Sequence, residues 1–158
     1  MVMWLRLLSG FMGVAWVVSA GAAVAPDKIG PAWVWSVEGD YEDVRDDLVN
    51  AIEGRGLVIS YVSHAQSMLS RTAQAVGMPE PVYAHAEILL FCKADLSHKL
   101  VAANPHNIVL CPYAIAVYEL AGAEHEIYLA IRAPDDQVVA YRPVVALLTD
   151  IISEVVED

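Results

Sequence analysis

The 158-residue chain has few basic side chains and few cysteines, and each shortage argues against certain partners or fold types. Nine Lys and Arg stand against twenty Asp and Glu, so the formal net charge is −11 at pH 7. A surface of this charge repels phosphate backbones and anionic lipids, and we expect neither nucleic acid nor a membrane surface as a partner. With two cysteines the fold must depend on a buried core rather than on a disulfide framework.

The sequence also lacks the short motifs of the common catalytic sites. It has no Gly-x-Ser-x-Gly elbow, no phosphate-binding glycine loop and no His-Glu-x-x-His zinc helix. Covalent haem attachment is excluded because no Cys-x-x-Cys-His occurs. These absences favour a non-enzymatic protein.

The first 22 residues have the three-part plan of a secretory signal. One basic residue, Arg6, precedes an apolar run that ends in small residues up to Ala22. The alternative is a retained membrane anchor, because the run approaches the length of a spanning helix. We expect a cleaved signal over residues 1–22, a leader and the start of the first strand over 23–36, and one domain over 37–158, located in the periplasm or secreted.

Alternation of apolar residues predicts strands within 32–39, 57–62, 84–92, 107–120 and 127–134. Helical spacing predicts helices within 39–56, 64–77, 96–105 and 143–155. The last two strands are joined by a short turn, which predicts a hairpin. We therefore expect an α+β fold with a single sheet of about five strands, mixed or antiparallel, packed by helices.

The order of these pieces resembles the bacterial domain of unknown function 302 family. The resemblance is carried by "VRDDLVNAIEGRGLVISYVSHAQSM", "ILLFC", "LCPYAIAVYEL" and "IYLAIRAP", within Val37 to Pro134. It implies a small α+β domain, often exported and often dimeric, without an established enzymatic activity. The chain departs from the family pattern at Cys92-Lys93-Ala94, where a Gly-Asn-Pro turn is frequent, and at Cys111, where leucine usually precedes the proline.

The two cysteines are predicted to lie on neighbouring strands. Cys92 ends the third predicted strand and Cys111 lies in the fourth, so a disulfide is the first expectation in an oxidising compartment. Two reduced thiols and a redox-active pair are the alternatives. A zinc site with His98 and His106 is a further alternative, although the spacings differ from those of zinc knuckles.

His64 is the histidine that follows the second predicted strand within the family-like block. It serves either as a capping or partly buried residue or as a ligand for haem iron or a transition metal. Met68, one helical turn later, would line an apolar pocket beside it. His85 and Glu87 share a strand face and could pair.

Three hypotheses follow. The first is a non-enzymatic binding or accessory protein of the periplasm, a homodimer, with a small ligand or an envelope protein as partner. The second is a non-covalent haem- or metal-binding redox accessory that uses His64. The third is a thiol oxidoreductase that uses Cys92 and Cys111.

Overall fold

A computed structural model describes residues 24–135 and 137–157. The predicted signal segment, residues 1–22, lies outside this range. The strands are β1 (Asp27–Ile29), β2 (Ala32–Glu38), β3 (Val58–Ser63), β4 (Tyr83–Cys92), β5 (Tyr113–Leu120) and β6 (Glu126–Arg132). The helices are α1 (Tyr41–Glu53), α2 (Ala65–Ala73), α3 (Ala94–Ala103) and α4 (Arg142–Glu157), with short 3-10 turns at Pro105–Leu110 and Val139–Tyr141.

The strands form one open sheet in the order β1-β2-β6-β5-β4-β3, and every neighbouring pair is antiparallel. This confirms the α+β class and the β5–β6 hairpin, and it places β5 inside the sheet. The described chain has six strands rather than about five. The additional strand is β1, which was predicted as leader and which pairs with β2 after a turn at Gly30, where φ is +54°.

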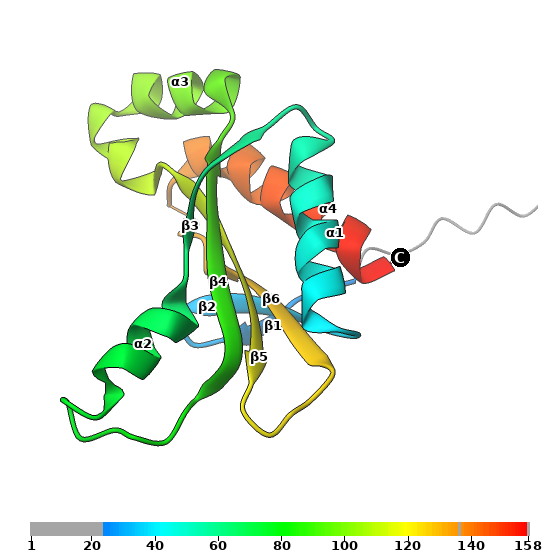
Figure 1. Ribbon diagram of the computed structural model, residues 1–158. Helices are drawn as coiled ribbons and strands as arrows, with labels where there is room; N and C mark the ends of the chain where they lie inside the picture. The colour runs from blue at the N-terminus through cyan, green and yellow to red at the C-terminus, as the bar shows by residue number, and fades with distance from the viewer. Residues whose placement is uncertain (1–23, 136, 158) are drawn as a thin grey trace, which may run out of the picture.

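The core lies between the sheet and the two helices α1 and α4, which cover the same face (Figure 1). Both helices are amphipathic, and their apolar stripes are buried because the sheet presents apolar side chains at every second position. The residues at most 2% exposed are Leu48 and Ile52 of α1, Leu100 of α3, Val144, Leu148, Ile151 and Ile152 of α4, and Trp35, Leu89, Phe91, Tyr113, Ile115, Val117, Ile127 and Leu129 of the sheet.

Local signals explain where α1 begins and ends. The Asp40 side chain accepts a hydrogen bond from the backbone N–H of Glu42, which satisfies one of the free donors of the first turn. The helix ends at Gly54, and Gly56 follows with φ +72°, a conformation that favours glycine.

Two local details differ from prediction. Residues 105–110 form a 3-10 turn, so β5 begins only at Tyr113 and Cys111 precedes the strand instead of lying in it. The Cys111–Pro112 peptide is cis. His64 occupies the N-cap position of α2 and makes no side-chain capping hydrogen bond there, since its ring is bonded to a carboxylate instead.

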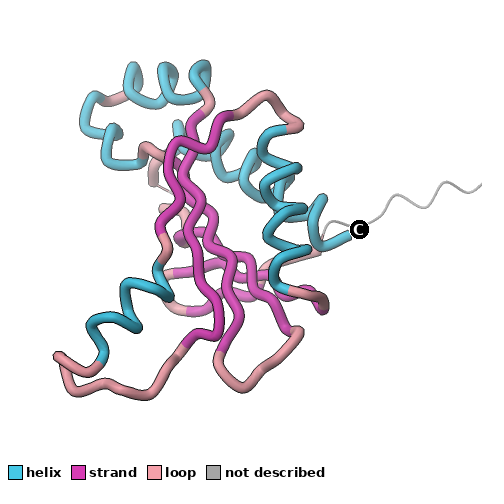
Figure 2. The backbone as a smooth tube through the Cα atoms, in the orientation of Figure 1, coloured by secondary structure: helices cyan, strands magenta, loops and turns pink. Residues whose placement is uncertain are grey.

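Helix α2 stands apart from the core. It packs against β4, yet none of its residues is buried, and Figure 2 shows it projecting from the sheet with a long loop returning to β4. Within the described ranges no helix is both long and apolar enough to cross a membrane.

Candidate functional site

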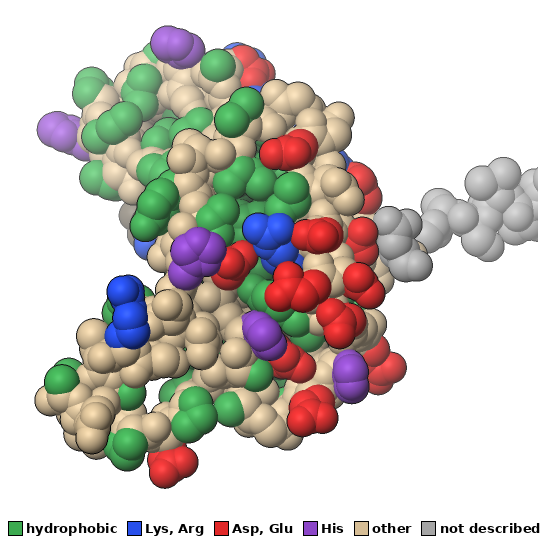
Figure 3. Space-filling view, viewed as in Figure 1, with side chains coloured by type: hydrophobic (Ala, Val, Ile, Leu, Met, Phe, Trp, Pro, Cys, Tyr) green, Lys and Arg blue, Asp and Glu red, His purple; other side chains and the backbone are tan. Residues whose placement is uncertain are grey.

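His64 lies in an open cleft where α1, the beginning of α2 and β4 meet. β3 pairs with β4 so that Ser63 is opposite Ile88, and this register brings the next residue, His64, beside Glu87. The cleft has a volume of about 570 Å³. Figure 3 shows histidine, arginine and acidic side chains gathered in the middle of this face. The lining residues are Tyr41, Glu42, His64, Gln66, Ser67, Arg71, His85, Ala86 and Glu87.

Glu87 is the centre of the polar network in this cleft. One carboxylate oxygen lies 2.6 Å from Nδ1 of His64, and the other accepts a hydrogen bond of 3.2 Å from Nε of Arg45. Arg45 also binds Asp46 at 2.9 Å, and this hydrogen bond is the main reason why the pKa of the guanidinium is raised. Glu87 is therefore held from two sides and in turn fixes the imidazole.

The bond from His64 to Glu87 determines which ring nitrogen is available to a ligand. A carboxylate at Nδ1 favours a proton on that nitrogen, which leaves Nε2 as the coordinating or accepting atom of the neutral ring. Within the described part of the chain no hydrogen bond to Nε2 is found, and the His64 side chain is 66% exposed. His64 thus presents an oriented nitrogen at the mouth of the cleft.

His85 belongs to a second group in the same cleft. Its ring stacks on Tyr41 with centroids 4.5 Å apart, and its Nε2 lies 3.8 Å from a carboxylate oxygen of Glu119 on β5. Glu119 is 9% exposed and accepts a hydrogen bond from the backbone N–H of His125. His85 and Glu87 do share a strand face, but each side chain pairs with a different residue.

Tyr41 forms part of the floor of the cleft. Its hydroxyl is buried and has no hydrogen-bond partner among the described residues. Burial is the largest cause of its raised pKa, followed by the negative charge of Glu87. The phenol therefore stays neutral, and its unpaired hydroxyl carries a desolvation cost.

Met68 is separated from His64 by one helical turn, and its backbone N–H donates to the His64 carbonyl. Its side chain is exposed and does not line the cleft, because the cleft side of α2 carries Gln66, Ser67 and Arg71. Across residues 24–135 and 137–157, no three His, Cys, Asp or Glu side chains come together in a way that could hold a metal ion. His98 and His106 are exposed.

The two cysteines form a separate cluster at the far end of β4. Both are free thiols in the structure. They are neighbours because Phe91 of β4 pairs with Tyr113, the first residue of β5. Cys92 follows Phe91 at the end of β4, and Cys111 lies two residues before Tyr113. Sγ of Cys111 lies 3.7 Å from Oγ of Ser97, whose hydroxyl also bonds to the Tyr113 hydroxyl at 2.9 Å.

The surroundings of Cys92 suppress its ionisation. Burial raises the pKa of the thiol, and the neighbouring Cys111 thiol raises it further. A redox-active cysteine needs the opposite shift, because the thiolate is the attacking species. The geometry brings the predicted pair together, while the direction of the pKa argues against fast thiol exchange.

Reasoning from the sequence missed Arg45, Tyr41 and Glu119 as members of the cleft. Arg45 is the single base within the acidic stretch 38–47, and Glu119 is the single charge within the apolar strand 113–120. A lone charge of this kind is the signal that could have indicated a partner across the fold. The partner itself could not be named, because it comes from another element.

Comparisons with known proteins agree with the resemblance noted in the sequence. The profile of the family described as Domain of unknown function DUF302 matches residues 33–155. The structure is similar to the crystal structure of an uncharacterized conserved DUF302 protein from Bacillus stearothermophilus, with a TM-score of 0.54 and 13% sequence identity over 82% of this chain and 94% of that chain. At this identity the likeness concerns the fold alone. No curated protein matches the chain.

Proposed function

Because the chain belongs to the DUF302 family, whose description names no activity, we propose a function from its own geometry. It is a non-enzymatic binding protein of the bacterial periplasm, and its ligand contacts Nε2 of His64. The observation that carries this proposal is the 2.6 Å contact between His64 and Glu87, with Glu87 held by Arg45. The periplasmic location is supported by the signal-like sequence of residues 1–22.

Binding is favoured over catalysis by the openness of the cleft. His64 is largely exposed, and no described element covers it, so water has free access to any bound group. Catalytic sites gain much of their power by excluding water from charged groups. An oriented but solvated imidazole is suited to holding a ligand.

The geometry favours a ligand that already contains a metal ion over a bare metal ion. A histidine whose second nitrogen is bonded to a carboxylate is the usual arrangement of a metal-binding imidazole. A bare ion would need several protein donors, which the described residues do not bring together. Haem needs only one or two ligands from the protein, and Nε2 of His64 would be one of them. Non-covalent haem binding is therefore the specific form of the proposal.

The test is a titration of the purified chain, without residues 1–22, with ferric haem and separately with Zn²⁺. We expect a saturable shift of the Soret band with haem and no stoichiometric zinc. His64→Ala loses the shift, and Glu87→Gln weakens binding about 10- to 100-fold, the usual range for an outer-shell partner.

His106→Ala is the matched control, since this histidine is also exposed but lies outside the cleft. A Soret shift that survives His64→Ala, or that His106→Ala removes equally, would contradict the assignment. Stoichiometric zinc binding lost with His64 would redirect the proposal from haem to a bare ion. A wild-type chain that binds neither group overturns it.

We also propose a homodimer through β3, the edge strand opposite β1. Its sequence, VISYVS, contains neither a charge nor a proline, the usual protection of an edge, and Val58 and Tyr61 are 75% and 63% exposed. Light scattering should give twice the monomer mass, and Tyr61→Lys should halve it. The matched control is Ile29→Lys on the other edge strand, β1, which should keep the dimer. A monomeric wild type refutes the proposal.

A further inference from the structure

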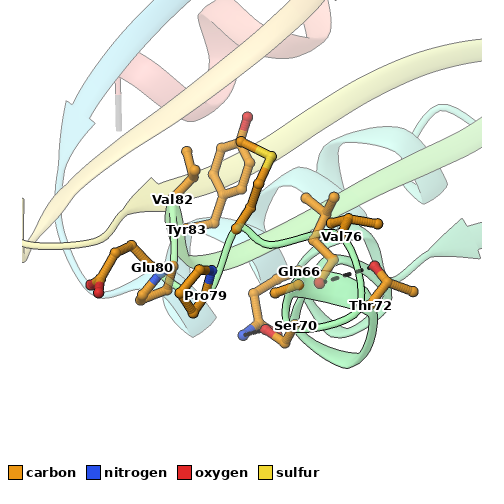
Figure 4. Close-up of a pocket in the computed structure, with 12 residues that line it drawn as sticks. Gln66, Ser70, Thr72, Val76, Pro79, Glu80, Val82 and Tyr83 are labelled. Carbon is orange, nitrogen blue, oxygen red and sulfur yellow. Dashed lines mark hydrogen bonds between the residues drawn. The ribbon is translucent and has the colours of Figure 1, made fainter.

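A second cavity lies on the other side of α2, between this helix and the loop that returns to β4. Its volume is about 310 Å³. Figure 4 shows α2 forming one wall and residues 79–83 forming the other. The space-filling view shows the corresponding opening between them (Figure 3). Most of its lining is apolar, with Leu69, Ala73, Val76, Met78 and Val82 as members.

With the exception of Tyr83, the polar side chains of this lining are already engaged in hydrogen bonds or turned away. The Gln66 amide donates to the Ser70 hydroxyl at 3.1 Å, and the Thr72 hydroxyl donates to the carbonyls of Met68 and Leu69. The Glu80 carboxylate points away from α2 in Figure 4. Lys, Arg and His are absent from the lining residues. An anionic group would therefore meet no opposite charge here, and a strongly polar one would lose most of its hydrogen bonds to water.

The size of the cavity limits what it accommodates. An engineered cavity of roughly 150 Å³ takes one benzene molecule. A cavity of about 310 Å³ accordingly takes an apolar body of about two fused rings or a short acyl chain. Small-molecule sites begin at roughly this volume and have the same predominance of apolar walls.

The exposed apolar side chains around the cavity favour binding of a ligand there. α2 has no buried residue, and Leu69, Val76, Met78 and Val82 remain between 43% and 69% exposed. Filling the cavity removes this apolar surface from water, which is favourable. We infer that the cavity between α2 and residues 78–83 binds a small uncharged apolar molecule. This site differs from the His64 cleft, with which it shares only Gln66.

The experiment uses the uncharged naphthalene dye 6-propionyl-2-dimethylaminonaphthalene, whose emission shifts to the blue in an apolar site. We expect saturable binding at one site per chain, displaced by naphthalene and at least about tenfold less effectively by 2-naphthalenesulfonate. Ala73→Trp, which fills the cavity, should raise Kd at least about tenfold. Ala75→Trp, on the same segment but outside the lining, should leave it unchanged.

If Ala73→Trp fails to fold by circular dichroism, Val82→Arg on the opposite wall replaces it, with the same expected loss. Unsaturable binding by the wild type, or equal binding by the wall variants and Ala75→Trp, overturns the inference. Equal displacement by the sulfonate overturns the requirement for an uncharged molecule. Ferric haem binding by Ala73→Trp should equal that of the wild type, which separates this site from the proposed haem site.

Discussion

Oxidation of Cys92 and Cys111 to a disulfide should stabilise the domain measurably. The thiols are neighbours, one at the end of β4 and the other just before β5, and export would expose them to an oxidising compartment. In thiol–disulfide exchange with oxidised glutathione, the two thiols lose two protons and two electrons, and glutathione disulfide is reduced to two thiols. The raised pKa of Cys92 predicts that this exchange is slow at neutral pH and accelerates as the pH rises.

The magnitude follows from the loop that the bond closes. From Cys92 to Cys111 the loop contains about 20 residues, and closing it removes entropy from the unfolded chain worth about 3 kcal/mol at 25 °C. For a domain of this length the entropy of unfolding near the midpoint is roughly 0.3 kcal/mol/K, so Tm should rise by about 10 °C.

The assay compares thermal unfolding of the oxidised and the reduced protein, with the loss of two hydrogens verified by mass spectrometry. Cys92→Ser combined with Cys111→Ser is the control, and its Tm should not respond to oxidant. Failure of the bond to form under strong oxidant would refute the inferred proximity of the two sulfurs. A bond that forms but lowers Tm would show that the native geometry is strained by it.

Three further predictions concern residues at the start of α1 and in the core. Asp40→Ala removes the cap on Glu42 and should lower the free energy of unfolding by about 1 kcal/mol in urea titrations, whereas exposed Asp47→Ala should not. Tyr41→Phe removes a buried hydroxyl without a described partner and should leave stability unchanged or raise it by about 1 kcal/mol; a clear loss would mean that the hydroxyl is bonded. Burial raises the pKa of Tyr113 to about 12, whereas the pKa in the unfolded chain is about 10. Between about pH 10 and 12 the phenol therefore ionises only in the unfolded chain, and the free energy of unfolding should fall across this range. Absorbance at about 295 nm checks this, and complete titration of all tyrosines near pH 10 in the folded protein would contradict it.

Prediction from the sequence succeeded where the signal is local and periodic. Helical spacing within residues 143–155 predicted α4, and helical spacing within residues 39–56 predicted α1. It failed at Asp27–Ile29, because a three-residue strand has too few positions to show alternation and forms only when β2 is available to pair with it. It also extended the fourth predicted strand back over Cys111, since a short apolar 3-10 turn and a strand have similar compositions.

The candidate site was predicted only in part. His64 was identified from its place between a strand and a helix, and its contact with Glu87 depends on the register of β3 against β4. Met68 was expected beside it from helical spacing alone. The rotation of α2 against β4 turns Gln66, Ser67 and Arg71 toward the cleft instead.

The sequence by itself determined the α+β class, the presence of the four helices and the acidic charge, because each depends on neighbours within a few residues or on composition. Only the tertiary structure decided which charges meet. Arg45, His64 and Glu87 come from three separate elements, and an ion pair between them exists only after strand pairing and helix packing have set their distances. The cavity behind α2 likewise arises from a loop returning to the sheet, which no local pattern encodes.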